Sequence, residues 1–385
     1  MIDQENLKKH KHFCYEIFKN ISVWSLNGRL AYNPCSFSRG CSKITDGFNL
    51  SEVWFSDERQ TIKDRVLQDE PIAGCQNCYD LESNGLRSRR QTSIDLYEQY
   101  HRDTDLFLDG PTSLDYSVGN LCNLKCMICG PGNSSSWIPD YQKIWPLEDV
   151  SQFYYEKHNQ IEIDDPSVLK NIKTVHFHGG GEPLMSAAHI NLLSRIEEIK
   201  GLSDVRVMYN TNGTLRVSAD VLKLWEKCRL IELYFSIDDI GPRFEYQRTN
   251  ASWAEVQDNL RWYYHNMPHN HMFSINCVWG YLNFYYLDEI LQWHQQNFST
   301  NRFGDPTNFI FQKALGHFGL DTISDRARNV LQSKFQKYPS LLALVDSLKT
   351  DNSNSHAEFW KHVCSIDKVR GRDFRILCPE WSELL

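Results

Sequence analysis

The feature that most constrains the fold of this chain is an alternation of strand-like and helix-like segments between residues 111 and 316. Short apolar runs, expected as strands, lie at 113–118, 174–178, 205–209, 231–237, 272–278 and 309–313. Amphipathic stretches, expected as helices, lie at 187–200, 219–227, 253–265 and 287–296. This alternation predicts an α/β fold with a parallel sheet, open or curled into a partial barrel. Ligands of such sheets bind at the carboxyl ends of the strands.

The cysteines are the second informative feature. The 12 cysteines in 385 residues are too few for a disulfide scaffold, which typically exceeds ~8% Cys. The start of the chain is polar, and no run approaches the ~18 apolar residues that span a bilayer. We therefore expect a cytoplasmic protein with no membrane partner, in which clustered cysteines are metal or redox sites. The net charge of −8 does not favour nucleic acid as a partner.

Three cysteines follow the first expected strand directly, as Cys122-x3-Cys126-x2-Cys129. A closed structural metal site needs four ligands, so three thiolates on one loop leave a position open for a substrate or cofactor. Iron–sulfur clusters are the usual occupants of cysteine-only sites with such spacing. The alternative is half of a zinc site whose fourth ligand comes from elsewhere in the chain.

This motif resembles that of the radical S-adenosylmethionine (radical SAM) superfamily, which carries C-x3-C-x2-C after the first strand of a partial (β/α)6 TIM-type barrel. The resemblance implies that Cys122, Cys126 and Cys129 bind a 4Fe–4S cluster whose open iron is chelated by the amino and carboxylate groups of SAM. It also implies that one electron cleaves SAM to methionine and a 5′-deoxyadenosyl radical, which abstracts hydrogen from a substrate. The family usually has an aromatic residue where this chain has Ile128.

Later motifs extend the resemblance. A glycine run after the second strand, 179–183, matches the family's GGEP motif, and Asp239 replaces a glycine in the family's Ser-Ile-Asp-Gly pattern. Turn formation and, for Arg248, a surface ion pair are the alternatives. His176 and His178 fall on one face of the second strand, where packing and a substrate contact both stay open. The resemblance implies SAM contacts from Gly180, Gly181, Glu182, Pro183, Asn210, Asn212, Ser236, Asp238, Arg248 and Ile128.

A second cysteine cluster precedes the barrel. It comprises Cys14, Cys35, Cys75 and Cys78, with a hairpin signal at 27–28, and could hold zinc or a second iron–sulfur cluster. This region resembles the SPASM or twitch module of radical SAM enzymes, which implies an auxiliary 4Fe–4S cluster on these four cysteines. Cys41 is a possible competitor of Cys35. The residues Glu82, Gly85, Ser88 and Arg89 resemble a subfamily with this module placed before the barrel.

The resemblance implies a small N-terminal α+β cluster-binding domain at 1–100, a radical SAM barrel at 111–316 and a C-terminal helical extension at 317–385. It also implies an enzyme that uses SAM, two 4Fe–4S clusters and an electron donor such as a flavodoxin or ferredoxin. We expect a peptide substrate that is oxidised, cross-linked or epimerised. The alternatives are a dehydrogenase of sugars or aminoglycosides and, from a different class, a zinc-binding interaction protein. No catalytic side chain is assigned.

Overall fold

The computed structural model describes residues 7, 9–26, 29–36, 38, 43–45, 50–83, 87–100, 110–153, 163–301, 303–304, 306–353 and 356–385. The chain divides into two compact units, each made of several segments. The first unit comprises Met1–Gly119, Tyr155–Tyr209 and Ala219–Ile231. The second unit comprises Asn120–Tyr154, Asn210–Ser218 and Glu232–Leu385.

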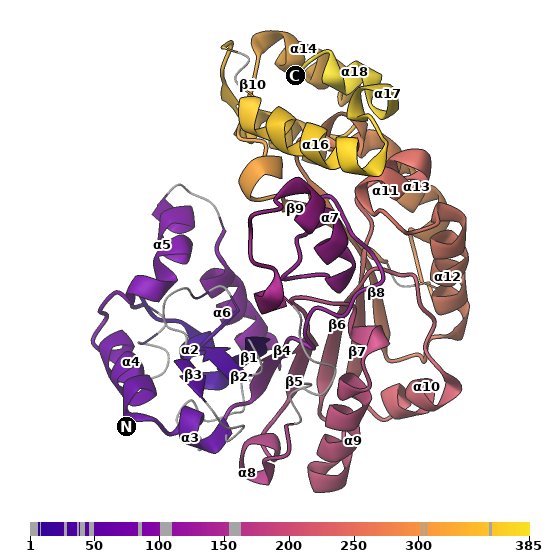
Figure 1. Cartoon of the computed structure of the whole chain (residues 1–385). Coiled ribbons are helices and arrows are strands. Elements are labelled where there is room, and N and C mark those ends of the chain that lie inside the picture. Colours follow the sequence, from indigo (N-terminus) through magenta and orange to yellow (C-terminus); the bar gives the residue numbers. More distant parts are fainter. Residues whose placement is uncertain are drawn as a thin grey trace. The chain divides into compact units, whose positions relative to one another are not determined.

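The first unit, coloured from indigo to magenta along the chain in Figure 1, combines a sheet with flanking helices. Its strands lie in the order β3-β2-β1-β4-β5-β6. The β1–β2 and β2–β3 pairs are antiparallel, whereas β1–β4, β4–β5 and β5–β6 are parallel. Its elements are α2 (Tyr15–Lys19), β1 (Asn20–Leu26), β2 (Arg29–Asn33), β3 (Lys43–Thr45), α3 (Leu50–Trp54), α4 (Asp57–Leu67), a 3-10 helix (Ala73–Cys75), α5 (Gln76–Ser83), α6 (Arg89–Tyr100), β4 (Ser113–Tyr116), α8 (Pro166–Leu169), β5 (Thr174–Phe177), a 3-10 helix (Pro183–Met185), α9 (Ala188–Lys200), β6 (Arg206–Thr211), whose last two residues belong to the second unit, and α10 (Ala219–Glu226).

One face of the parallel strands forms the core of this unit. Side chains alternate between the faces of a strand, and the core face carries only large apolar residues that are almost fully buried. They are Leu114, Tyr116, Val175, Phe177, Val207 and Tyr209. From α9, His189 places Nδ1 3.0 Å from the hydroxyl of Tyr209, to which Trp225 of α10 also donates at 3.2 Å. These hydrogen bonds satisfy polar groups inside an otherwise apolar layer.

The N-terminal part of the chain contains the expected hairpin. One strand of this hairpin also pairs with the parallel sheet, which the sequence did not predict. Strands β1 and β2 pair in a register that sets Ser22 opposite Asn33. The turn residues Asn27 and Gly28 lie outside the described residues, and so do Cys41 and Gly85. Beyond the hairpin, β1 also pairs with β4 in parallel. The segment after β3 forms two helices, α3 and α4, because Ser56 begins the second by accepting a hydrogen bond from the Arg59 backbone N–H.

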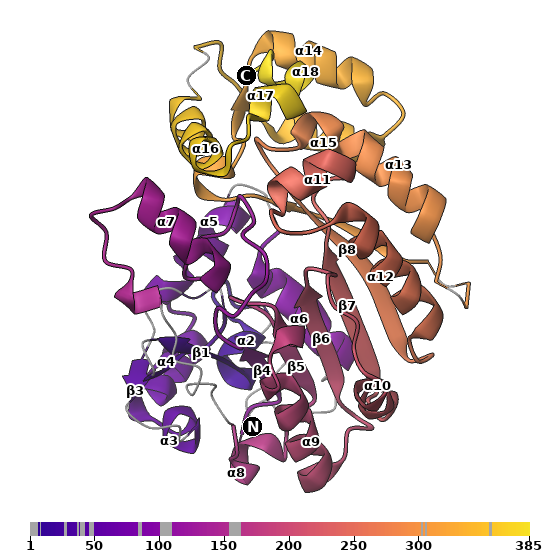
Figure 2. The same ribbon diagram turned by 45° about the vertical axis from the view of Figure 1, so that its right-hand side comes forward.

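The second unit contains the strands β7, β8 and β9, and β8 pairs with β9 in parallel. Figure 2 shows the helices α14 to α18 of its C-terminal part gathered together. Its elements are a 3-10 helix (Ser135–Trp137), α7 (Ile138–Ile144), a 3-10 helix (Ser151–Phe153), β7 (Leu230–Ser236), which begins in the first unit, α11 (Gly241–Gln247), α12 (Trp253–Asn266), β8 (His271–Trp279), a 3-10 helix (Phe284–Tyr286), α13 (Leu287–Phe298), β9 (Asn308–Lys313), a 3-10 helix (Gly316–Phe318), β10 (Thr322–Ile323), α14 (Asp325–Lys334), α15 (Pro339–Ser347), β11 (Lys349–Thr350), α16 (Ala357–Arg370), α17 (Phe374–Leu377) and α18 (Pro379–Ser382).

The expected α/β class is confirmed. Each strand expected between residues 113 and 313 corresponds to one of β4 to β9, and the expected helices correspond to α9, α10, α12 and α13. The fold is mixed α/β with a parallel sheet, consistent with a partial TIM-type barrel. The domain boundaries at 1–100, 111–316 and 317–385 stay predictions. Among the described residues, no helix is both long enough and apolar enough to cross a membrane.

The buried ring of His189 predicts a pH-dependent stability. Burial lowers the pKa of His189 to about 4, while an unfolded chain protonates histidine near pH ~6.5. Between these values only the unfolded state gains the proton, so stability falls as the pH drops. At ~1.4 kcal/mol per pKa unit, the loss attributable to His189 between pH 7 and pH 5 is about 2 kcal/mol.

Urea unfolding at pH 7 and pH 5 measures this loss. We expect His189→Gln, which keeps a polar group beside Tyr209, to show a smaller loss than the wild type, and the control His269→Gln, at an exposed position, to match the wild type. An equal loss in wild type and His189→Gln would contradict the assignment.

Candidate functional site

The predicted cluster cysteines lie on a loop of the second unit between β4 and α7. Cys126 is buried, while Cys122 and Cys129 are partly exposed. A hydrogen bond between the thiols of Cys126 and Cys129 lowers the pKa of the first and raises the pKa of the second. Cys122 also interacts electrostatically with Cys129. The loop therefore brings the three thiols into one neighbourhood, as its spacing predicted.

Backbone hydrogen bonds fix this loop against the segment that follows α11. The backbone N–H of Lys125 donates to the carbonyl of Thr249 at 3.0 Å, and that of Met127 donates to the carbonyl of Gln247 at 2.7 Å. The indole of Trp137 donates to the carbonyl of Cys126 at 2.7 Å. Because these bonds flank Cys126 on both sides, they hold its side chain against residues 247–249.

Two nitrogen donors face the sulfur atoms. Arg248 Nη1 lies 3.8 Å from Cys126 Sγ, and Asn212 Nδ2 lies 3.8 Å from Cys122 Sγ. Arg248 Nε is also buried and has no hydrogen-bond partner among the described residues. Hydrogen bonds to cysteine sulfur tune iron–sulfur clusters, and a buried free N–H is suited to an anionic ligand. Three thiols with these donors fit a cluster with one open iron and a carboxylate-bearing ligand.

The predicted surface alternative for Arg248 is wrong, because its ion pair is buried. Arg248 and Asp238 are 6% and 2% exposed, and Arg248 Nη2 lies 2.8 Å from Asp238 Oδ2. The backbone N–H of Val278 donates to Asp238 Oδ1 at 2.9 Å. Burial alone would lower the pKa of Arg248, but the ion pair with Asp238 raises it above its ordinary value. The guanidinium is therefore fixed in its charged form.

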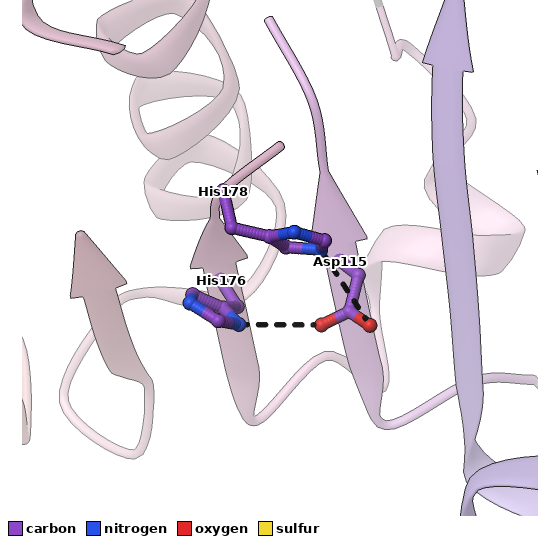
Figure 3. A group of neighbouring side chains, drawn as sticks. All are labelled: Asp115, His176 and His178. Carbon is purple, nitrogen blue, oxygen red and sulfur yellow. Dashed lines mark ion pairs between the residues drawn. The ribbon is translucent and has the colours of Figure 1, made fainter. Parts of the chain in front are cut away.

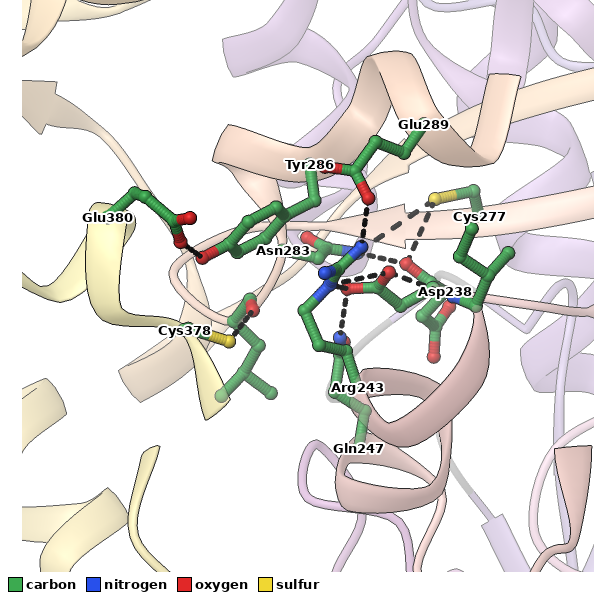
Figure 4. Close-up of polar contacts among 12 residues, drawn as sticks. Asp238, Arg243, Gln247, Cys277, Asn283, Tyr286, Glu289, Cys378 and Glu380 are labelled. Atoms are coloured by element: carbon green, nitrogen blue, oxygen red, sulfur yellow. Dashed lines mark hydrogen bonds and ion pairs between the residues drawn. The ribbon is translucent and has the colours of Figure 1, made fainter. Parts of the chain in front are cut away.

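Figure 4 shows a neighbouring polar network that includes Arg243, Gln247 and Asn283. Asp239, which stands where the family has glycine, belongs to this network. Arg243 Nε lies 3.1 Å from both carboxylate oxygens of Asp239, and Gln247 Nε2 donates to it at 3.1 Å. Asn283 Nδ2 donates to the Asp238 carbonyl at 2.6 Å. This network connects the end of β7 to the start of α11. Asp239 takes part in it through its carboxylate, which a glycine at this position would not have.

A further set of residues that support the cysteine loop escaped prediction. Asp140 on α7 accepts from Lys125 Nζ at 3.0 Å and from Arg370 Nε at 2.8 Å. Burial would raise the pKa of Asp140, but these two hydrogen bonds hold it below its ordinary value. Arg370 of α16 also stacks over Trp137, with 4.4 Å from Cζ to the ring centroid. In the sequence, the feature that could have drawn attention to these contacts is Arg-Gly-Arg at 370–372.

The remaining predicted SAM residues are divided between the units. Asn210, Ser236 and Ile128 belong to the second unit, whereas Gly180 to Pro183 belong to the first. In the first unit, Gly179 and Gly181 have φ angles of 92° and 81°, which glycine adopts without the strain of a side chain. Glu182 is 1% exposed, and its Oε1 accepts from the backbone N–H of Leu184 at 3.2 Å. The motif is therefore a tight, internally bonded turn.

The four predicted auxiliary cysteines line one cavity in the first unit. Cys14 precedes α2, Cys35 follows β2, Cys75 ends the 3-10 helix before α5, and Cys78 lies in the first turn of α5. Burial, together with Glu16 and Cys75, raises the pKa of Cys14 to about 12. Four thiols around one cavity fit an all-cysteine metal centre, and a metal would have to displace the proton that burial holds on Cys14.

Arg89, which was named from the sequence, lines this cavity together with Glu16 and Arg90. Glu82 hydrogen-bonds with Ser88 and accepts from Arg90 Nε at 2.9 Å, and Arg90 Nη1 donates to the carbonyl of Phe13 at 2.8 Å. Arg89 pairs with Glu16 at 3.3 Å. These contacts join α5 and α6 to the segment that carries Cys14.

The buried ion pair predicts a large loss of stability when Arg248 is shortened. Arg248→Met leaves the Asp238 carboxylate buried without its cation, and breaking a buried pair in this way costs about 3–5 kcal/mol. Asp238→Asn combined with Arg248→Met removes both charges and should recover part of that loss. Urea unfolding of the wild type, single and double variants measures both effects. A single variant as stable as the wild type would contradict the pairing.

Part of the chain matches a known protein family and several known proteins. Residues 116–293 match the family model of the Radical SAM superfamily. The chain is 27% identical over 159 residues to a GTP 3′,8-cyclase of Alkaliphilus metalliredigens (strain QYMF), covering 41% of this chain and 44% of that protein. It is 26% identical over 151 residues to a GTP 3′,8-cyclase of Limosilactobacillus fermentum, covering 38% and 37%. The chain thus spans less than half the length of these curated relatives.

Solved structures with a resemblance include anSMEcpe with bound AdoMet, at 15% identity and a TM-score of 0.40, covering 62% of this chain and 63% of that chain. Another is Streptococcus suis SuiB bound to precursor peptide SuiA, at 11% identity and a TM-score of 0.36, covering 90% and 74%. The family match rests on the sequence of residues 116–293, which includes the three-cysteine loop. That match implies a 4Fe–4S cluster and SAM. The chain carries a radical SAM domain within residues 116–293.

Proposed function

We propose that this protein is an enzyme that cleaves SAM reductively and abstracts a hydrogen atom from a peptide. The observation that carries the proposal is the cysteine loop, in which Cys122, Cys126 and Cys129 lie together with nitrogen donors facing their sulfur atoms. When bound, the cluster supplies one electron that divides SAM into methionine and a 5′-deoxyadenosyl radical. That radical takes a hydrogen atom from a substrate C–H bond and leaves 5′-deoxyadenosine.

The chain's own residues have assigned tasks in this proposal. Cys122, Cys126 and Cys129 hold the cluster, and Arg248 and Asn212 donate to its sulfur ligands. The buried Nε of Arg248, which has no partner in the described part of the chain, is suited to the SAM carboxylate. Asp238 fixes the orientation of that guanidinium through their 2.8 Å contact. Gly180 to Pro183 offer a glycine-rich turn whose backbone is open to a ligand.

We also propose that Cys14, Cys35, Cys75 and Cys78 hold a second 4Fe–4S cluster. The cavity that all four cysteines line supports this assignment. Full ligation by four thiolates suits electron transfer or structural support rather than direct binding of the substrate. The cluster would accept one electron from the substrate radical if the reaction is an oxidation. Cys41 is the alternative ligand.

The peptide class is favoured by the net charge of −8, which suits a neutral or basic substrate. The curated relatives named GTP 3′,8-cyclase cover at most 41% of this chain, so their substrate is not transferred to it. A cytoplasmic flavodoxin or ferredoxin is the proposed electron donor. The competing class is a sugar or aminoglycoside substrate.

We expect Cys126→Ala to abolish reductive SAM cleavage, because it removes one of only three cysteine ligands of the proposed open cluster. The assay incubates the anaerobically reconstituted full chain with SAM and dithionite and measures 5′-deoxyadenosine by mass spectrometry. The control Cys364→Ala alters an exposed cysteine outside both clusters and should retain wild-type production. Undiminished 5′-deoxyadenosine from Cys126→Ala would refute the cluster assignment.

The same assay distinguishes the substrate classes. A pool of fully deuterated peptides should transfer deuterium into 5′-deoxyadenosine, whereas a pool of deuterated monosaccharides and aminoglycosides should not. The reverse pattern would keep the radical chemistry and overturn the peptide proposal.

Replacing Cys75 tests the second cluster separately. The reconstituted wild type should bind about eight irons per chain, and Cys75→Ala should bind about four, since each 4Fe–4S cluster needs its thiolates. Iron and acid-labile sulfide analysis measures the difference, again with Cys364→Ala as the control. Wild-type iron content in Cys75→Ala would refute the site, and about four irons in the wild type with one zinc that Cys75→Ala loses would assign zinc to it.

A further inference from the structure

The second face of strands β4, β5 and β6 is unexpectedly polar. A parallel sheet covered on both faces normally carries apolar residues on both, and the core face does so here. The other face instead borders a cavity within the first unit. The strand residues that line it are Ser113, Asp115, Thr174, His176, Arg206 and Met208. Polar side chains in a sheet interior indicate a ligand site rather than a packing surface.

Three residues on this face converge (Figure 3). Asp115 and His176 are direct partners in the β4–β5 register, and His178 follows two residues later on the same face. His176 Nδ1 lies 3.6 Å from Asp115 Oδ1, and His178 Nε2 lies 3.7 Å from Asp115 Oδ2. One potential ligand atom from each residue lies within 4.8 Å of those of the other two.

Three of the four imidazole nitrogens have no hydrogen-bond partner among the described residues. His176 Nδ1, His176 Nε2 and His178 Nε2 are buried without a hydrogen bond, and their distances to Asp115 exceed hydrogen-bond length. Asp115 Oδ2, in contrast, accepts from Asn20 Nδ2 at 3.1 Å. Such an outer hydrogen bond orients carboxylates that bind metals. A cation bound between the buried imidazole nitrogens and the oriented carboxylate would give each of these groups a partner.

We propose that Asp115, His176 and His178 bind one divalent transition-metal ion, of which Zn²⁺ and Fe²⁺ are the best suited. Two imidazoles with one carboxylate are characteristic ligands of both ions. Ligand atoms ~2.1 Å from a tetrahedral ion are about 3.4 Å apart, so these atoms, which lie within 4.8 Å of one another, would move closer together when the ion binds.

The proposed site is open on one side. Three protein ligands leave at least one position free, as in catalytic rather than structural metal sites. Because Asp115 and His176 line the cavity, that position faces a space lined also by Lys19 and Arg206. Basic side chains beside a metal suit an anionic ligand, so the chemical class expected there is a carboxylate of the substrate. This site is additional to SAM cleavage and does not depend on it.

The test measures zinc binding without SAM or reductant. The full chain, with its clusters reconstituted so that the cluster thiolates are occupied, is dialysed anaerobically against micromolar ZnCl₂ and passed through a desalting column. We expect about one zinc per chain by mass spectrometry, and zinc-edge X-ray absorption should show only nitrogen and oxygen ligands at ~2.0–2.1 Å. No retained zinc, or a sulfur shell at ~2.3 Å, would overturn the site.

Variants locate the zinc. His178→Ala and Asp115→Asn should each lose it, and His269→Ala, at an exposed position, should retain it. Zinc should also raise the melting temperature of the wild type and of His269→Ala but not that of the two site variants. Retention of one zinc by His178→Ala would place it elsewhere. Should a variant fail to fold, the wild-type absorption spectrum still decides the proposal.

Discussion

The cysteine loop of the second unit depends on the hydrogen bonds that join it to residues 247–249. The bonds from Lys125 to Thr249 and from Met127 to Gln247 leave little freedom for Cys126 between them. They also determine which side chain faces its sulfur, since Arg248 is the residue between the two acceptors. Asp238 then neutralises Arg248 in a buried ion pair. The same loop is also held by ion pairs, because Asp140 contacts both Lys125 and Arg370. Helix α16, which carries Arg370, therefore supports a loop that lies far earlier in the chain.

Charge connects two sites within the first unit. Glu16 and Arg89 line both the cysteine cavity and the cavity beside Asp115. Burial alone would lower the pKa of Arg89, yet Glu16 and Asp115 raise it, with smaller contributions from Cys35 and Cys14. Electrostatic interactions are strong where water is excluded. A change of charge at the four cysteines would therefore alter the field at Asp115, which makes Arg89 the physical link between the proposed second cluster site and the proposed metal site.

The sequence predicted the alternating elements well because strands and helices of a parallel sheet leave strong periodic signals, as β4 to β9 and their helices show. The loop cysteines were predictable because their spacing is local. The bracing of Asp140 by Lys125 and Arg370 was not, because it joins residues far apart in the chain. The parallel pairing of β1 with β4 escaped for the same reason. His176 and His178 were seen to share a face, but their convergence on Asp115 depends on the strand register, which periodicity alone does not determine.

The central claim is that three cysteines leave one iron open for SAM. Electron–nuclear double resonance tests it most directly, on the reduced full chain with SAM labelled with ¹⁵N in its amino group and ¹⁷O in its carboxylate. The account predicts hyperfine coupling of both labels to a 4Fe–4S signal that Cys126→Ala lacks. A cluster signal with no coupling to either label would contradict the account, because it would mean that SAM does not bind the iron.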